Sequence, residues 1–329
     1  MRNLFTRRRS REPACRLFFA SDIHGSERCF RKWLNAARVY GVDVLLLGGD
    51  VTGKTMVPLV ANGRGQWSGV LHGKQVSCRN VDELTELQAS IRAIGYYDVV
   101  VTPDDARTLE SDASFQARLF QRVMEETLER WLVLADERLD GSNVQCFAML
   151  GNDDLPELAK CMRKAKRIFY AEDSIYELPG GIELASFGYS TPTPWSTPRE
   201  LAESDMARRI EELVSGLQRP ERAIFNFHCP PKDTHLDQAP RLDGQLRPVV
   251  DAGGAHTVSA GSGAVRAAIE KYQPVLGLHG HVHESPAAQR IGTSLCINPG
   301  SDYPEGVLRG ALVTLGIERG VLQWQLTQG

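Results

Sequence analysis

The sequence lacks the features that mark disulfide-rich, membrane-spanning and strongly charged proteins. Its 329 residues contain seven cysteines, an odd number with no CxxC pair, so we expect reduced thiols in a cytoplasmic protein rather than a disulfide framework. No stretch approaches the roughly 20 consecutive apolar residues of a transmembrane helix. The formal net charge is only −3, which gives no general electrostatic case for binding nucleic acid or a membrane.

The N-terminus is basic, but it does not have the pattern of an export signal. MRNLFTRRRSREPAC is rich in arginine, yet the apolar run that follows, residues 17–20, is shorter than the about 7 to 15 residues that a signal peptide needs. We predict a disordered basic arm over residues 1–15, with contact to nucleic acid or an anionic surface as the alternative. One domain over residues 16–329 follows, and a hydrophobic content of 42% suffices for its core.

What the sequence does contain is a series of short apolar runs, each of which ends in a polar residue. In LFFASDIHGS the polar residues Asp22 and His24 are two positions apart, and residues at that spacing on an extended chain point the same way. The other runs are VLLLGGD, CFAMLGNDD, AIFNFH and LGLHGHVH, which end at Asp50, Asn152 to Asp154, His228, and His281 with His283.

These endings supply seven potential metal ligands: Asp22, His24, Asp50, Asn152, His228, His281 and His283. A single Asp or His at the end of a strand is more often a cap or a satisfied hydrogen-bonding group. Five such endings in one chain favour a shared metal site instead. The set mixes oxygen and nitrogen donors without cysteine, which suits two borderline or hard divalent ions and argues against a structural zinc site.

The spacing between the first two endings indicates how they could meet. Phe30, Leu34 and Ala37 recur at helical spacing, and Val42 to Leu47 form a continuous apolar run, so the segment predicts a strand, a helix and a second parallel strand. Parallel neighbours would place Asp22 and Asp50 at one carboxyl edge, where open α/β sheets bind their ligands.

The motifs DxH, GGD, GND, a strand-end histidine and GHVH, in this order, resemble those of the calcineurin-like metallophosphoesterases. The resemblance extends from Arg16 to about Tyr303. DVTGK at 50–54, PTPWSTPRE at 192–200 and LHGHVHES at 278–285 are similar to a bacterial branch of predicted phosphoesterases that has GND in place of GNH. The resemblance implies a four-layer αββα sandwich of two mixed sheets flanked by helices, which the predicted strands and helices also indicate.

The resemblance also implies the roles of the ligands. One divalent ion would be bound by Asp22, His24, Asp50 and His283, and the second by Asp50, Asn152, His228 and His281, so that Asp50 bridges them. The ions would be Mn, Fe, Zn or Ni, and a hydroxide bridging them would hydrolyse a phosphate-ester small molecule or nucleotide. The catalytic residues implied are Asp22, His24, Asp50, Asn152, Asp153 and His228.

One position departs from the family pattern. Many members have histidine after Gly-Asn, whereas this chain has Asp153, which ionises near about pH 3.9 when unperturbed and is a poor general acid. We therefore predict a preference for phosphodiesters with good leaving groups. His279 could replace the donor, although a buried structural histidine is favoured. A catalytically weak metal-binding scaffold and a nuclease are the alternative functions, and the nuclease would require a basic groove.

Other parts of the chain also carry predictions. The long interval between Asp50 and Asn152 predicts an inserted subdomain or cap at about 55–140. The proline-rich segment up to Arg199 is either a rigid connector or a substrate-facing wall that includes Trp195 and Arg199. The helix after Gly261 could hold a phosphate at its N-terminus, with Arg266 one turn in, and the strands at 294–297, 311–315 and 321–326 are expected to close the second sheet.

Overall fold

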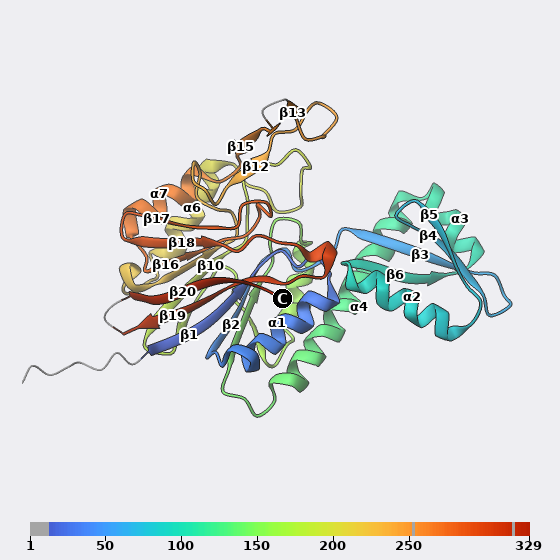
Figure 1. Ribbon diagram of the computed structural model, residues 1–329, viewed down its shortest axis with the longest axis horizontal. Helices are drawn as coiled ribbons and strands as arrows, with labels where there is room; N and C mark the ends of the chain where they lie inside the picture. Colours follow the sequence, from blue (N-terminus) through green and yellow to red (C-terminus); the bar gives the residue numbers. More distant parts are fainter. Residues whose placement is uncertain (1–12, 252–253, 318–319) are drawn as a thin grey trace, which may run out of the picture.

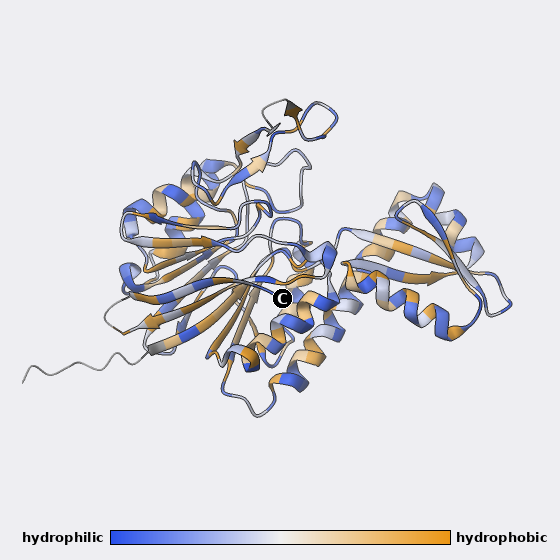
Figure 2. Cartoon of the chain, in the orientation of Figure 1, coloured by the Kyte–Doolittle hydropathy of each residue, from blue (hydrophilic) through white to orange (hydrophobic). Residues whose placement is uncertain are grey.

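Two six-stranded sheets pack face to face, with helices on both outer faces, in the computed structural model (Figure 1), which describes residues 13–251, 254–317 and 320–329. Because each sheet has two apolar faces, each requires cover on both sides. The central strands are accordingly hydrophobic along most of their length (Figure 2). The predicted αββα sandwich is confirmed.

The first sheet contains four parallel strands and an antiparallel hairpin. Its order is β20 (Gly320–Gln328), β19 (Arg309–Gly316), β1 (Pro13–Ala20), β2 (Val44–Gly48), β7 (Gln145–Met149) and β8 (Ile168–Tyr170). In register, Leu17 of β1 lies opposite Val44 of β2 and Val313 of β19.

The second sheet has four parallel strands in its centre and one antiparallel strand at each edge. Its order is β17 (Ala287–Ile291), β18 (Ser294–Asn298), β16 (Leu276–Leu278), β11 (Ile224–Phe227), β10 (Ile182–Phe187) and β9 (Ser174–Leu178).

The helices divide between the two outer faces. α1 (Glu27–Tyr40) and the second half of α4 (Ala113–Leu139) pack on the first sheet, through residues such as Trp33 and Trp131. α6 (Glu203–Val214) and α7 (Gly263–Tyr272) pack on the second sheet. A third apolar cluster, which includes Phe19, Leu46 and Leu278, fills the space between the sheets. Alternate residues of the inner strands therefore serve two different cores.

A smaller four-stranded sheet stands to one side of the sandwich, and α4 connects it to the first sheet (Figure 1). Its order is β5 (Lys74–Cys78), β4 (Trp67–Leu71), β3 (Thr55–Ala61) and β6 (Tyr96–Val101). α2 (Val81–Ala93) packs on one face, where Val57 and Leu59 meet Leu84 and Ile91. α3 (Pro103–Ser111) contacts β3 and β6, as well as α4.

The remaining elements are short. They are α5 (Ala159–Met162), the 3-10 turns Pro156–Leu158, Pro220–Arg222 and Tyr303–Glu305, and the strand pairs β12 (Gln238–Pro240) with β15 (Thr257–Ser259) and β13 (Val250–Asp251) with β14 (Gly254–Ala255). Of the helices in the described ranges, none has the length and apolar content needed to cross a membrane.

Two expectations need correction. The segments 311–315 and 321–326 belong to β19 and β20 of the first sheet, not to the second, because β19 finds its partner in β1 at the far end of the chain. The basic arm is predicted over residues 1–15. Residues 1–12 lie outside the described residues, whereas residues 13–15 form the start of β1. Cys15 is paired there with Leu315.

Candidate metal centre

The predicted ligands follow the carboxyl ends of strands in both large sheets. Asp22 and His24 follow β1, Asp50 follows β2 and Asn152 follows β7, whereas His228 follows β11, and His281 and His283 follow β16. The two sheets face each other, so the loops after these strands meet at one edge of the sandwich. The structure thereby brings all seven predicted ligands to one place.

Four of these residues have a left-handed backbone, which non-glycine residues adopt rarely and at a cost. The φ angles are 56° at Asp22, 37° at His24, 48° at Asp50 and 68° at His281. Hydrogen bonds between loops hold the conformations: the amide of Asp22 donates to Gly49 O at 3.0 Å, and that of His24 to Asp50 O at 3.0 Å. Backbone strain concentrated at four predicted ligands supports a functional role for these loops.

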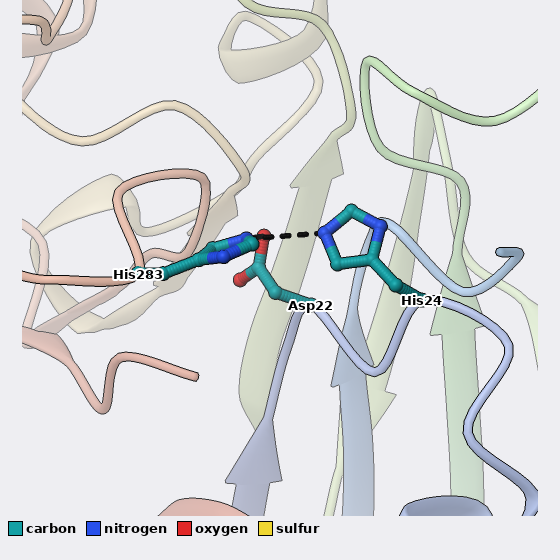
Figure 3. Close-up of side chains that lie close together, drawn as sticks. All are labelled: Asp22, His24 and His283. Carbon is teal, nitrogen blue, oxygen red and sulfur yellow. Dashed lines mark hydrogen bonds and ion pairs between the residues drawn. The ribbon is translucent and has the colours of Figure 1, made fainter. Parts of the chain in front are cut away.

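Asp22, His24 and His283 form one cluster (Figure 3). The Nε2 atoms of the two imidazoles are 3.0 Å apart, and His283 Nε2 is 3.4 Å from Asp22 Oδ1. Nδ1 of His24 is buried and makes no hydrogen bond within the described chain. Burial lowers the pKa of His24 to about 3, so the imidazole stays neutral and the lone pair of its unprotonated nitrogen is available to a cation.

A second cluster joins Asp22 and Asp50 to His228. Nδ1 of His228 lies 2.8 Å from Gly48 O, which can only accept, so Nδ1 carries the proton. Nε2 then faces Asp50 Oδ2 at 3.3 Å and Asn152 Oδ1 at 3.1 Å. An electron pair that faces oxygen acceptors requires a positive charge between them, either a second proton or a metal ion. A backbone carbonyl that orients the other nitrogen is a common arrangement around metal-binding histidines.

The carboxylates of Asp22 and Asp50 favour a cation beside His228. Burial lowers the pKa of His228, but Asp50 and Asp22 outweigh it and raise the pKa to about 9. Burial likewise opposes ionisation of Asp50, yet His228 holds the pKa of this carboxyl well below its usual range. Without a metal, the proton on His228 would balance the carboxylates, and a divalent ion would take its place.

Asn152 is oriented by the proline-rich segment. Its Nδ2 donates to Thr197 Oγ1 at 2.9 Å, which turns Oδ1 toward Nε2 of His228 and toward Nδ1 of His281, at 2.7 Å. Thr197 Oγ1 in turn donates to Glu200 Oε1 at 2.7 Å. The segment therefore acts at least as a rigid support for a predicted ligand, in agreement with the connector interpretation.

Asp50 has the central position. It belongs to two clusters, one with Asp22 and His228 and the other with His24 and Asp153. Its Oδ2 lies 3.3 Å from Nε2 of His228 and 3.7 Å from Nε2 of His24, histidines that come from different sheets. Its Oδ1 accepts from the amide of Asp153 at 2.9 Å. A carboxylate between two histidines can contribute to two ion sites at once.

Sequence reasoning overlooked two residues beside this centre. The ammonium of Lys54 pairs with the carboxylate of Asp153. The buried Asp154 accepts hydrogen bonds from the amides of Val51, Thr52 and Gly151 at 2.8–3.0 Å and so ties the loop after β2 to the loop after β7. Lys54 lies in the DVTGK motif and Asp154 lies in the GNDD motif. The opposite charges in these two motifs were the signal in the sequence that could have indicated contacts between them.

Two of the three predicted substrate contacts have partners within the chain, and their contact with substrate stays a prediction. The Arg199 side chain is only 3% exposed, and its guanidinium pairs with the buried Glu172, donates to Gly151 O at 2.8 Å and lies over the Tyr189 ring. Arg266 donates to Lys232 O and pairs with Glu270. Both arginines thus link separate parts of the chain.

The phosphate site expected at the start of α7 also needs correction, because a carboxylate of the chain occupies it. Glu203 accepts from Ser262 Oγ at 2.7 Å and from the amides of Gly263 and Ala264 at 2.7 and 2.9 Å. His279 is buried and Nδ1 contacts Phe227 O at 2.8 Å, in agreement with the structural interpretation. Trp195 is 63% exposed, and its contact with substrate stays a prediction.

Comparison with known proteins places the fold in context. No family model matches the chain. It is similar to the uncharacterized protein MJ1162 of Methanocaldococcus jannaschii, with 27% identity over 120 residues, which is 36% of this chain and 48% of that protein. The match thus spans about half the length of that curated relative.

One solved crystal structure covers 96% of this chain and 99% of its own, with a TM-score of 0.57 and 16% identity. TT1561 of Thermus thermophilus has a TM-score of 0.49 at 14% identity and covers 96% of this chain and 98% of its own. A dimetal phosphatase from Danio rerio has a TM-score of 0.44 at 9% identity and covers 96% of this chain and 99% of its own. The match to the first structure spans nearly the whole chain. This chain and that structure therefore share their overall fold, and the loops after the strands carry groups of Asp and His side chains that could hold metal ions.

Proposed function

We propose that the protein is a calcineurin-like metallophosphoesterase that hydrolyses phosphate esters with two divalent ions, such as Mn, Fe, Zn or Ni. The observation that carries the proposal is the convergence of seven oxygen and nitrogen donors in which lone pairs of His228, Asn152 and Asp50 face one another. Such a group is stable only around positive charge. Two ions that share Asp50 as a ligand would supply the positive charge that these lone pairs require.

The contacts support a division of the donors into two sets. Asp22, His24 and His283 lie together with Asp50 in reach of His24. Asn152 lies between His228 and His281, and Asp50 is in reach of His228. When bound, two divalent ions would supply positive charge to the phosphoryl group and lower the pKa of a bound water molecule to about 7. The chain itself supplies the ligands and fixes their positions.

Asp153 and Lys54 would shape the preference for substrates. Burial, followed by the charge of Asp50, raises the pKa of Asp153, while Lys54 opposes the rise. Because the Lys54 ammonium offsets the charge of Asp153, a phosphomonoester dianion is repelled less than it would be if Lys54 were absent. The proposed preference for phosphodiesters rests mainly on the missing histidine. Two bound divalent ions would keep the neighbouring Asp153 ionised, and a leaving group that needs no proton is lost most easily.

The test is hydrolysis of bis-nitrophenyl phosphate by the full chain supplied with Mn or Ni, with metal content measured in parallel. We expect up to two ions per chain and turnover that a chelator abolishes. The matched variant Asp50→Asn keeps the side-chain size but removes the shared charge, and it should be inactive. Binding of two ions with no hydrolysis of any mono- or diester would instead establish the scaffold alternative, and no metal binding would refute both.

A further inference from the structure

The two faces of the small sheet are filled differently. β3 alternates its side chains, so Val57 and Leu59 point into the core beneath α2. Met56, Pro58 and Val60 point to the other face, and there the space toward α3 and α4 is not filled. A cavity of about 680 Å³ remains, and its walls also include Val70, Leu109 and Phe120. This volume is within the about 300–1,000 Å³ that is usual for small-molecule sites.

Lys54 connects this cavity to the candidate metal centre. It precedes β3 and lies in the same alternating row as Met56, and it lines the cavity. Its ammonium pairs with Asp153, and the amide of Asp153 donates to Asp50 Oδ1 at 2.9 Å. The hydrocarbon stem of a lysine packs on apolar surface while its charged end reaches a polar partner. One side chain thus lies against both the apolar cavity and the charged centre.

The charge in the cavity wall comes from two residues. Lys54 is the cation in its wall, Glu110 is the carboxylate, and the remaining residues that line it carry no charge. From Lys54 to Val60 the chain rises about 20 Å at about 3.3 Å per residue. An occupant of matching chemistry has an anionic group at the Lys54 end and an extended apolar group beyond it.

We propose that the cavity binds the apolar alcohol group of the ester substrate, so that the substrate is an amphiphilic phosphodiester whose phosphate lies at the metal centre beside Lys54. The inference rests on the proposed function for the phosphate and deepens it by naming the substrate class. The small sheet then determines specificity, whereas the two large sheets determine the chemistry.

Two series of probes test the proposal with the full chain. The first is nitrophenyl alkyl phosphodiesters with ethyl, hexyl and decyl groups, assayed with Mn. We expect kcat/KM to rise at least about threefold for each two added methylenes, because each buried methylene favours binding. The second is equilibrium binding of ethyl and decyl phosphate by calorimetry, below the concentration at which decyl phosphate forms micelles, where decyl phosphate should bind at least about 30-fold more tightly.

Variants locate the effect in the cavity. Ala117→Trp places a large ring in the wall on α4, and Leu109→Gln makes the wall polar at nearly constant volume. Each should reduce the preference for the decyl over the ethyl diester by about tenfold, because both residues line the cavity. Val133→Trp, at a residue of the same helix that is 57% exposed and does not line the cavity, is the matched control and should have no effect.

The outcomes separate this inference from the proposed function. If no diester is hydrolysed but decyl phosphate binds tightly and Ala117→Trp weakens it, the cavity site stands and the proposed hydrolysis is wrong. If bis-nitrophenyl phosphate is hydrolysed but neither rate nor affinity depends on chain length, the cavity proposal is overturned and the hydrolase stands. Equal behaviour of the Ala117→Trp and Val133→Trp variants would also overturn it.

Discussion

The strand-end loops and the N-terminus of α7 differ in how their polar groups are satisfied. At α7, Glu203 accepts three hydrogen bonds from Ser262, Gly263 and Ala264, so the anion that the helix favours is already part of the chain. At the strand ends, Asp50 and Nε2 of His228 face each other and are satisfied only when a proton or a metal ion lies between them. Sequence motifs predicted a ligand at both places.

The difference shows which observation identifies a binding site. Polar residues that satisfy one another form structure, whereas buried acceptors without donors require a partner from outside the chain. The predictions below vary one group at a time in each region.

The largest effect is expected for Asp50→Ala, because Asp50 lies in both ligand sets. We expect the loss of both ions and a decrease in phosphodiesterase activity of about 10³-fold or more, measured by metal analysis and steady-state rates. Glu126→Gln, at an exposed carboxylate on α4, is the control and should retain both. An Asp50→Ala protein with full occupancy and activity would remove the shared role and, with it, the contrast between the two regions.

The next effect concerns the support of the centre. Arg199→Met leaves Glu172 buried without its partner and should lower the free energy of unfolding by about 3–5 kcal/mol, measured by urea denaturation. Since Arg199 also donates to Gly151 O, the affinity for metal should decrease as well. Arg199→Met combined with Glu172→Gln should recover part of the stability. An unchanged stability with a raised KM would show instead that Arg199 contacts substrate, as the sequence predicts.

A smaller change is expected for Asp153→His, which introduces a side chain that can donate a proton near neutral pH. The kcat/KM for alkyl phosphomonoesters should rise about tenfold relative to bis-nitrophenyl phosphate. Asp153→Asn removes the charge without supplying a donor and is the control. If both variants change the ratio equally, charge rather than proton donation determines the preference, and a wild-type enzyme that favours alkyl monoesters would refute the predicted diester preference.

The smallest effect is expected at α7. Burial would raise the pKa of Glu203, but the amide of Ala264 and the hydroxyl of Ser262 outweigh it and lower the pKa. A lowered folded-state pKa contributes stability that is present above the unfolded value, about 4.3, and is lost as the pH falls through the folded value.

Glu203→Gln should therefore destabilise the protein by about 1 kcal/mol at pH 7, since the group is partly exposed, and the difference should diminish between pH 7 and pH 3. Urea denaturation at both pH values measures it. Glu212→Gln on the same helix, an exposed partner of Arg208, should change less. A stability difference that persists at pH 3 would contradict the assigned cause.

Local patterns were sufficient to predict much of the fold and the candidate centre. Apolar periodicity at Phe30, Leu34 and Ala37 identifies α1, because helical spacing repeats over several turns, and the helix predicted after Gly261 is α7. The pairing of Asp22 with Asp50 follows from two parallel strands joined by one helix, and the order of the motifs supplied the other five predicted ligands. Helical spacing and the polar endings of strands involve residues that are close together in the sequence, so both can be recognised without knowledge of the fold.

Tertiary structure decided whatever depends on partners far apart in the chain. β19 pairs with β1 rather than with the second sheet, Arg199 meets Glu172, Glu203 reaches the start of α7, and Lys54 connects Asp153 with the cavity beside β3. The sequence does not distinguish an exposed arginine from a buried one, because burial and pairing are properties of the packed chain. The strand endings could be recognised without that packing, whereas the partner of each charged side chain could not.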